Sequence, residues 1–260
     1  MNSIIQSLYD RKSVRAYTNQ DISEADVQTI LSAAVQAPSA GNQQLYTILR
    51  ITDPAVKHNL SISCDNQPFI EQAKLVLVFC ADCLKWYAAF NAAGCNPRSP
   101  QEGDLMLAVC DTMVAAQNAV IAAESLGIGS CYIGDIMEHY ETHRDLFGLP
   151  QYVFPVAMLV FGYPTEQQMK REKPKRVNMK YIVNENTYHE LTPEETMEMF
   201  SVKLSNQSYN QWINAFCNRK YNSDFSREMS RSVRRYLEDY KTNCKGTLTP
   251  YSNEKIYNPY

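Results

Sequence analysis

Apolar residues recur every three or four positions near the N-terminus and again in the middle of the chain, which predicts helices. Ser3 can cap a first short helix, and Ser23 can cap a second that ends before Pro38. A longer helix is predicted over 104–126, where repeated alanines would let another helix approach closely. This long helix therefore belongs in a core or at a subunit interface.

Three runs have the pattern of strands: 46–51, 75–80 and 156–161. The last two are almost continuously apolar, as expected for strands buried on both faces. Together they indicate a central sheet.

The chain has 260 residues, of which 45% are hydrophobic, so it can bury a substantial core. We expect one main domain over 1–190 and a helical arm over 191–260. From Pro193 onward the sequence is mostly polar with a helical stripe of apolar residues, which cannot form a core alone. The arm is expected to pack on the main domain or on a partner subunit, and the tail after Lys245 has no usable pattern.

Bulk charge and cysteine usage restrict the class of protein. The net charge of −3 gives no general attraction to polyanions, so no nucleic-acid partner is expected. Eight scattered cysteines fit a reducing cytoplasm; Cys80 and Cys83 have the spacing of half a zinc site, but no second pair accompanies them. The least charged stretch, 112–123, is too short to span a bilayer, and the N-terminus lacks a signal-peptide pattern. We therefore expect no membrane association.

Two basic clusters stand out in this acidic chain. Residues 11–15 (Arg-Lys-Ser-Val-Arg) follow a predicted helix, and 170–176 follow the last predicted strand. The first also fits a solvated basic turn, and the second a nucleic-acid patch or a localisation signal. Taken together they suggest one phosphorylated cofactor, since several cations can share the charge of a phosphate monoester. FMN is such a monoester, and the chain has neither a P-loop nor a dinucleotide-binding glycine motif.

Four segments, in order, make a family resemblance specific: 11–17, 33–42, 124–134 and 155–164. They resemble the successive signatures of the nitroreductase family over roughly residues 1–190. The resemblance implies an α+β fold with a central mixed, mainly antiparallel sheet flanked by helices. It also implies a homodimer with two FMN sites at the subunit interface.

The activity implied by the resemblance is hydride transfer from NAD(P)H through bound FMN to nitroaromatic, quinone-like or related small acceptors, by a ping-pong mechanism. The alternative is an FMN-binding protein without nicotinamide turnover, serving as a flavin carrier or receiving electrons from another protein. In both cases FMN carries the chemistry, so no side chain is expected to be a catalytic acid or base.

The resemblance also assigns flavin-contacting residues. The phosphate, ribityl chain and pyrimidine edge are held by Arg11, Lys12, Ser13 and Arg15, with Lys173 and either Lys175 or Arg176 on the far side. A loop expected to reach the flavin from the other subunit contains Pro38, Ser39 and Asn42. The isoalloxazine is lined by Tyr132, Ile133 and Gly134, and one branch of the family has a flavin-contacting glutamine that matches Gln67.

Two further expectations concern single side chains. Arg15 near the pyrimidine edge would stabilise the negative charge of reduced flavin and so tune it. His139 and His143 have the spacing of a zinc site on a helix, but their charged neighbours indicate a solvated surface helix, and no metal is expected.

Overall fold

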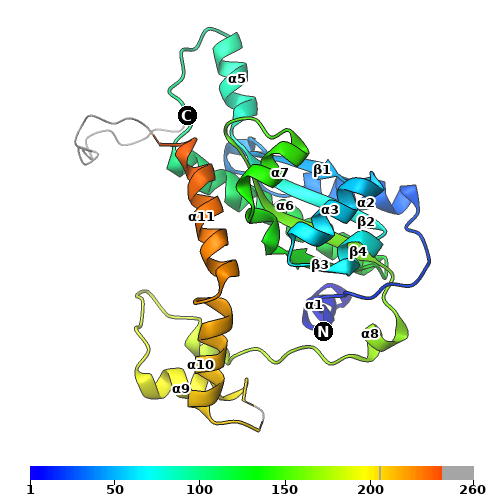
Figure 1. The fold of residues 1–260 in the computed structure, drawn as a ribbon, viewed down its shortest axis with the longest axis vertical. Coiled ribbons are helices and arrows are strands. Elements are labelled where there is room, and N and C mark those ends of the chain that lie inside the picture. The colour runs from blue at the N-terminus through cyan, green and yellow to red at the C-terminus, as the bar shows by residue number, and fades with distance from the viewer. Residues whose placement is uncertain (205, 242–260) are drawn as a thin grey trace.

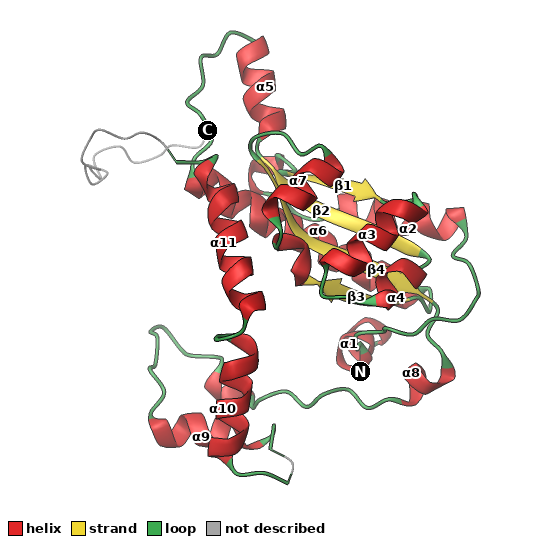
Figure 2. Cartoon of the chain, in the orientation of Figure 1, coloured by secondary structure: helices red, strands yellow, loops and turns green. Residues whose placement is uncertain are grey.

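The computed structural model describes residues 1–204 and 206–241; the tail after Lys245 lies outside them. Its sheet has four strands, β1 (Tyr46–Arg50), β2 (Leu75–Asp82), β3 (Gly129–Ile133) and β4 (Val153–Gly162). The strand order is β1-β2-β4-β3, and each neighbouring pair is antiparallel (Figure 2). The predicted α+β fold is confirmed, although β3 had not been predicted as a strand.

Helices cover both faces of this sheet (Figure 1). On one face lie α2 (Glu24–Val35) and α6 (Glu102–Ser125). On the other lie α3 (Pro54–Ser63), α4 (Pro68–Gln72) and α7 (Tyr140–Phe147). All residues of β2 and β4 are therefore buried, which explains why these strands are almost continuously apolar.

Helix α6 is the core helix of the protein. Its length and hydropathy would suffice to cross a membrane. It packs instead against α2 and the sheet, mainly through alanines that permit close approach. Its buried residues are Leu105, Ala108, Asp111, Thr112, Ala115, Ala116, Ala119, Val120 and Ala123.

The C-terminal part of the chain leaves the sheet and then returns to it (Figure 1). After α8 (Glu166–Lys170) an extended segment with the short helix η3 (Met179–Tyr181) leads to α9 (Pro193–Ser201) and α10 (Tyr209–Lys220). Both α9 and α10 lie away from the sheet, and α11 (Asp224–Glu238) runs back to it. The remaining helices are α1 (Ser3–Asp10), α5 (Leu84–Ala92), η1 (Ala40–Asn42) and η2 (Gly134–Met137).

Tyrosine packing fastens α11 to the main domain. The ring of Tyr236 lies 4.5 Å from that of Tyr140 and 4.7 Å from that of Phe154, measured between centroids. The backbone N–H of Tyr140 donates to Ser232 Oγ at 2.9 Å. Since Tyr236 is almost fully buried, this end of α11 is part of the hydrophobic core.

One prediction about the surface is wrong. His143 is fully buried rather than solvated: its Nδ1 lies 2.9 Å from the carbonyl oxygen of Ile136 and its Nε2 lies 2.8 Å from Ser63 Oγ. Burial lowers the pKa of His143, so its neutral form is favoured. Glu141 and Asp145 on the same helix are exposed, whereas His143 points into the core together with the partly buried Leu146 and Phe147. His143 therefore serves packing and hydrogen bonding.

Two glycines let the N-terminal segment lie close against the sheet. A Cβ atom on Gly129 would come within 2.5 Å of Val14, and one on Gly162 within 2.5 Å of Tyr17. Val14 N donates to Ser130 O at 2.9 Å, and isolated bridges pair Ser13 with Ser130 and Tyr17 with Pro164. The bridge at Ser13 is parallel and extends the sheet beyond β3, whereas the bridge at Tyr17 is antiparallel and involves a residue that follows β4.

Replacing Gly129 tests this close packing. We expect Gly129→Ala to lower the free energy of unfolding by about 1–3 kcal/mol, because the new methyl group overpacks against the stiff side chain of Val14. Urea unfolding followed by circular dichroism measures the change. Gly103→Ala is the matched control, since nothing lies within 4 Å of its Cβ position. Equal stability of the two variants would contradict the close-packing account.

Candidate functional site

The segment 11–17 and the stretch that follows β4 lie side by side. Thr165 N donates to Ala16 O at 3.2 Å, and Arg15 N donates to Gln168 Oε1 at 3.2 Å. Because Ser13 is also paired with β3 and Tyr17 with Pro164 after β4, the two predicted basic clusters are brought to one place.

A lysine side chain from each cluster bonds to backbone carbonyl groups just before the other cluster. Lys12 Nζ donates to the carbonyl oxygen of Met169 at 2.6 Å. Lys173 Nζ donates to the carbonyl oxygens of Leu8 at 3.0 Å and Tyr9 at 2.6 Å. We call Arg11, Lys12, Arg15, Arg171 and Lys173 the basic cluster.

Arg11 is the member of this cluster with unmet bonding capacity. Its Nε and Nη2 atoms are buried, and no described residue accepts a hydrogen bond from them. The guanidinium lies 5.6 Å from the centre of the Tyr132 ring. A buried charged donor without an acceptor is costly, so this position fits an anion that accepts from the guanidinium. The residues present thus fit a phosphate group.

The pKa of Lys173 reflects the closeness of the positive charges in the cluster. Its pKa lies below the usual value because of desolvation, followed by the nearby charges of Arg176 and Arg11. The carboxyl group of Glu124 also faces the cluster, and burial raises its pKa. A bound anion would relieve the repulsion among the cations.

Arg15 and Gln67 lie at the edge of the cluster near α4. The guanidinium of Arg15 is 5.9 Å from the centre of the Phe69 ring, two residues after Gln67. Gln67 precedes α4, and its Nε2 donates to the carbonyl oxygen of Cys64 at 2.8 Å. The Arg15 side chain therefore lies close to the start of α4, which Gln67 precedes.

The predicted ring-lining residues lie at the end of β3. Tyr132 is half-buried, its hydroxyl donates to Gln117 Oε1 at 3.2 Å, and burial raises its pKa to about 12. Ile133 is buried and Gly134, which begins η2, is exposed. These residues continue the strand whose edge carries the basic cluster.

The loop 38–45 is held by a buried carboxylate. Asp111 of α6 accepts hydrogen bonds from Ala40 N at 3.0 Å and Leu45 N at 3.3 Å. Within the loop, Ser39 Oγ accepts from Gln44 N at 2.6 Å, and Asn42 has a left-handed φ of 55°. Pro38 and Asn42 are exposed, and no hydrogen bond among residues 1–204 and 206–241 joins this loop to the basic cluster.

Lys175 and Arg176 follow on the extended segment after α8. Arg176 lies near Lys173, whose pKa it lowers. The carbonyl oxygen of Lys175 accepts from Lys203 Nζ at 3.1 Å, which ties this position to the start of the arm.

Three structural contributors were not predicted: Asp111, Gln168 and Arg171. Asp111 is an isolated acid within an otherwise apolar helix, and that isolation was a usable signal. Gln168 and Arg171 act through contacts with 15 and 13, more than 150 residues away, which leave no local pattern. Within the part of the chain that the structure describes, no group of three or more His, Cys, Asp or Glu residues is placed to hold a metal.

The family model described as "Nitroreductase family" matches residues 8–163, which include the basic segment, the loop and β3. The chain belongs to the nitroreductase family. This agrees with the resemblance of its four sequence segments. The matched region extends from α1 to just beyond the end of β4.

Individual members of the nitroreductase family match over most of the chain. An FMN reductase (NADPH) of Bacillus subtilis is 30% identical over 210 residues, 79% of this chain and 83% of the relative. An oxygen-insensitive NADPH nitroreductase of Salmonella typhimurium is 34% identical over 194 residues, 74% and 77% of the two chains. The crystal structure of nitroreductase A from Vibrio parahaemolyticus superposes with a TM-score of 0.77 at 26% identity, covering 92% of this chain and 97% of that one.

The buried carboxylate gives a test of how the loop is held. In Asp111→Asn one side-chain oxygen remains, so one of the two loop N–H groups loses its acceptor. We expect a loss of about 1–3 kcal/mol in the free energy of unfolding. Hydrogen exchange of the Ala40 and Leu45 amides should also accelerate relative to amides of β2. Unchanged exchange at both amides would refute the role given to Asp111.

Proposed function

We propose that the protein is an FMN-dependent oxidoreductase that takes hydride from NAD(P)H and reduces nitroaromatic, quinone-like or related small acceptors. The observation that carries this proposal is Arg11: its buried nitrogens have no acceptor among residues 1–204 and 206–241, and it lies inside a cluster of cations at the edge of β3. Membership of the nitroreductase family and relatives named as FMN reductases and nitroreductases support it.

In this proposal the FMN phosphate lies against Arg11, Lys12 and Ser13, with Lys173 on the far side. Arg176 is the better second partner there, because it lies beside Lys173 whereas Lys175 is tied to Lys203 through its carbonyl group. The flavin ring would extend along Tyr132, Ile133 and Gly134 toward Arg15 and Gln67. Relatives that use NADPH support that donor, and NADH remains included in the proposal.

Bound FMN supplies two-electron chemistry: NAD(P)H loses a hydride, and a quinone that gains this hydride and a proton becomes a hydroquinone. The chain's residues bind the cofactor and leave an open face for donor and acceptor. Arg15 would place positive charge near the pyrimidine edge and so favour the reduced, anionic flavin. A cytoplasmic location fits the use of NAD(P)H.

A homodimer completes this proposal. Helix α6 exposes Met106, Leu107, Met113 and Val114, which form an apolar stripe on the side away from the sheet. A second copy would bury this stripe, and the loop 38–42 would then reach the flavin of the partner. The arm would pack against the partner as well.

The first experiment tests cofactor and donor. The purified protein should be yellow, and anaerobic NADPH or NADH should bleach the flavin absorbance within seconds. Arg11→Met should weaken FMN binding at least tenfold, because a charge-assisted hydrogen bond to phosphate is lost. The exposed Arg227→Met is the matched control. A yellow protein that does not bleach would favour the alternative, a flavin-binding protein without nicotinamide turnover.

The second experiment tests whether the loop acts across the dimer. Arg11→Met and Asp111→Asn are co-expressed on chains with different tags, and the mixed dimer is isolated. One of its two sites then has an intact Arg11 and an intact partner loop, so it should bind about one FMN per dimer. Each variant alone should bind much less. A mixed dimer that binds no more FMN than the two variants would show that the loop serves its own chain.

A further inference from the structure

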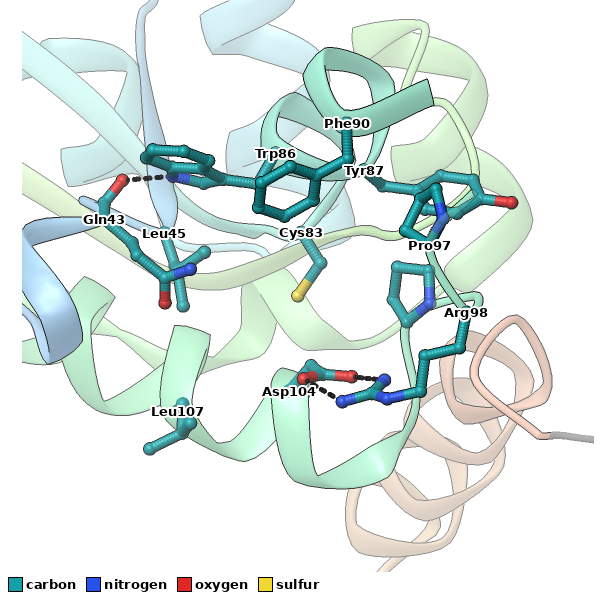
Figure 3. Close-up of a pocket in the computed structure, with 11 residues that line it drawn as sticks. Gln43, Leu45, Cys83, Trp86, Tyr87, Phe90, Pro97, Arg98, Asp104 and Leu107 are labelled. Carbon is teal, nitrogen blue, oxygen red and sulfur yellow. Dashed lines mark hydrogen bonds and ion pairs between the residues drawn. The ribbon is translucent and has the colours of Figure 1, made fainter. Parts of the chain in front are cut away.

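A second recess lies outside the basic cluster. It has a volume of about 330 Å³ and lies between α5, residues 97–100 and the start of α6 (Figure 3). This is near the lower end of the range of roughly 300–1,000 Å³ typical of small-molecule sites. We call it the ring pocket. Its size suits one or two fused rings.

Two unshielded aromatic rings form one wall of the ring pocket. Trp86 and Phe90 retain 38% and 37% of their surface exposed, and their ring centres are 5.5 Å apart at 40°. Exposed aromatic surface in a recess is covered most favourably by another flat ring, which stacks or packs edge to face. The wall therefore favours an aromatic ligand.

Hydrogen bonds within the chain fix the shape of the ring pocket. Trp86 Nε1 donates to the carbonyl oxygen of Gln43 at 2.7 Å, which fixes the indole ring. The start of α5 is held by Asp82, whose Oδ1 accepts from Leu84 N at 3.0 Å and Lys85 N at 3.3 Å. Such preorganisation lowers the entropy cost of binding.

The polar groups of the pocket favour a neutral ligand. Arg98 and Asp104 bond to each other through two nitrogen–oxygen pairs, so their charges compensate. The side-chain amide of Gln43 points toward the interior (Figure 3). An amide N–H suits the oxygen of a quinone or nitro group.

The position of the pocket links it to the flavin proposed above. Gln43 follows Asn42 directly, and Asn42 belongs to the loop proposed to reach the partner's flavin. Leu107 lines the pocket and also belongs to the apolar stripe of α6 that a second copy would bury. In the dimer the pocket would thus open beside the FMN bound by the partner.

We propose that the ring pocket binds the ring system of the electron acceptor, a neutral flat quinone or nitroarene of one or two rings, with Trp86, Phe90 and Gln43 setting acceptor specificity. This inference rests on the proposed function for the identity of the acceptor. The binding of a flat aromatic molecule by the pocket does not require turnover.

The test uses the oxidised, FMN-loaded protein and 2-methyl-1,4-naphthoquinone. Calorimetry without NAD(P)H should give a dissociation constant that Phe90→Ala raises about tenfold, through the loss of one aromatic contact. Phe90→Leu keeps apolar volume without the flat ring and should give a smaller rise. In turnover with NADPH, kcat/KM for the quinone relative to that for ferricyanide, which has no ring, should fall about tenfold in Phe90→Ala.

Tyr188→Ala is the control, since Tyr188 is a large exposed aromatic residue outside the pocket. It should leave the dissociation constant and the ratio as in the unaltered protein. The ring-pocket proposal is overturned if Phe90→Ala and Phe90→Leu bind the naphthoquinone as tightly as Tyr188→Ala does. If that result comes with rapid flavin bleaching by NADPH, the oxidoreductase function stands and only the pocket proposal fails. If NADPH does not bleach the flavin but Phe90→Ala binds the naphthoquinone more weakly, the function is overturned and the pocket proposal stands.

Discussion

The pairing of Ser13 and Val14 with the edge of β3, continued by the bridge from Tyr17 to Pro164 after β4, is the contact on which the basic cluster depends. Backbone bonding from Val14 to Ser130 sets the register, so Ser13 and Arg15 take fixed positions on either side of Val14. This approach is possible only because Gly129 and Gly162 have no side chains in the way. The two glycines, which have no side-chain functional group, therefore determine where the charged residues lie.

Electrostatics then decides what the cluster can hold. Lys12 and Lys173 have carbonyl acceptors, which satisfy part of their bonding capacity, while the buried nitrogens of Arg11 have none within the described residues. The site thus combines a hydrogen-bonded scaffold with one side chain, Arg11, whose buried N–H groups can donate hydrogen bonds to an anion. A small acidic protein gains a local cation-rich surface without a net positive charge.

Local pattern was sufficient for the elements with strong periodicity or continuous burial, such as α2 after its Ser23 cap and the strands β2 and β4. It was insufficient for β3, which has five residues and begins with glycine. The pairing of Lys12 with Met169 joins positions 157 residues apart, so only the fold can reveal it. The prediction for His143 was wrong because its charged neighbours masked the core-facing side of its helix. The basic segments themselves were visible in the sequence because they contrast with an acidic chain.

The stretch from Arg171 to Tyr236, which leads into the arm and includes α9, α10 and most of α11, is fastened to the main domain at both of its ends. Arg171 donates to the carbonyl oxygen of Ser13 at its beginning, and Tyr236 is buried against Tyr140 and Phe154 at its end. The stretch between is a closed loop rather than a dangling extension, which limits the volume it can explore. A protease that cut this stretch once would produce two fragments that stay associated, because each remains in contact with the main domain at its own end of the stretch.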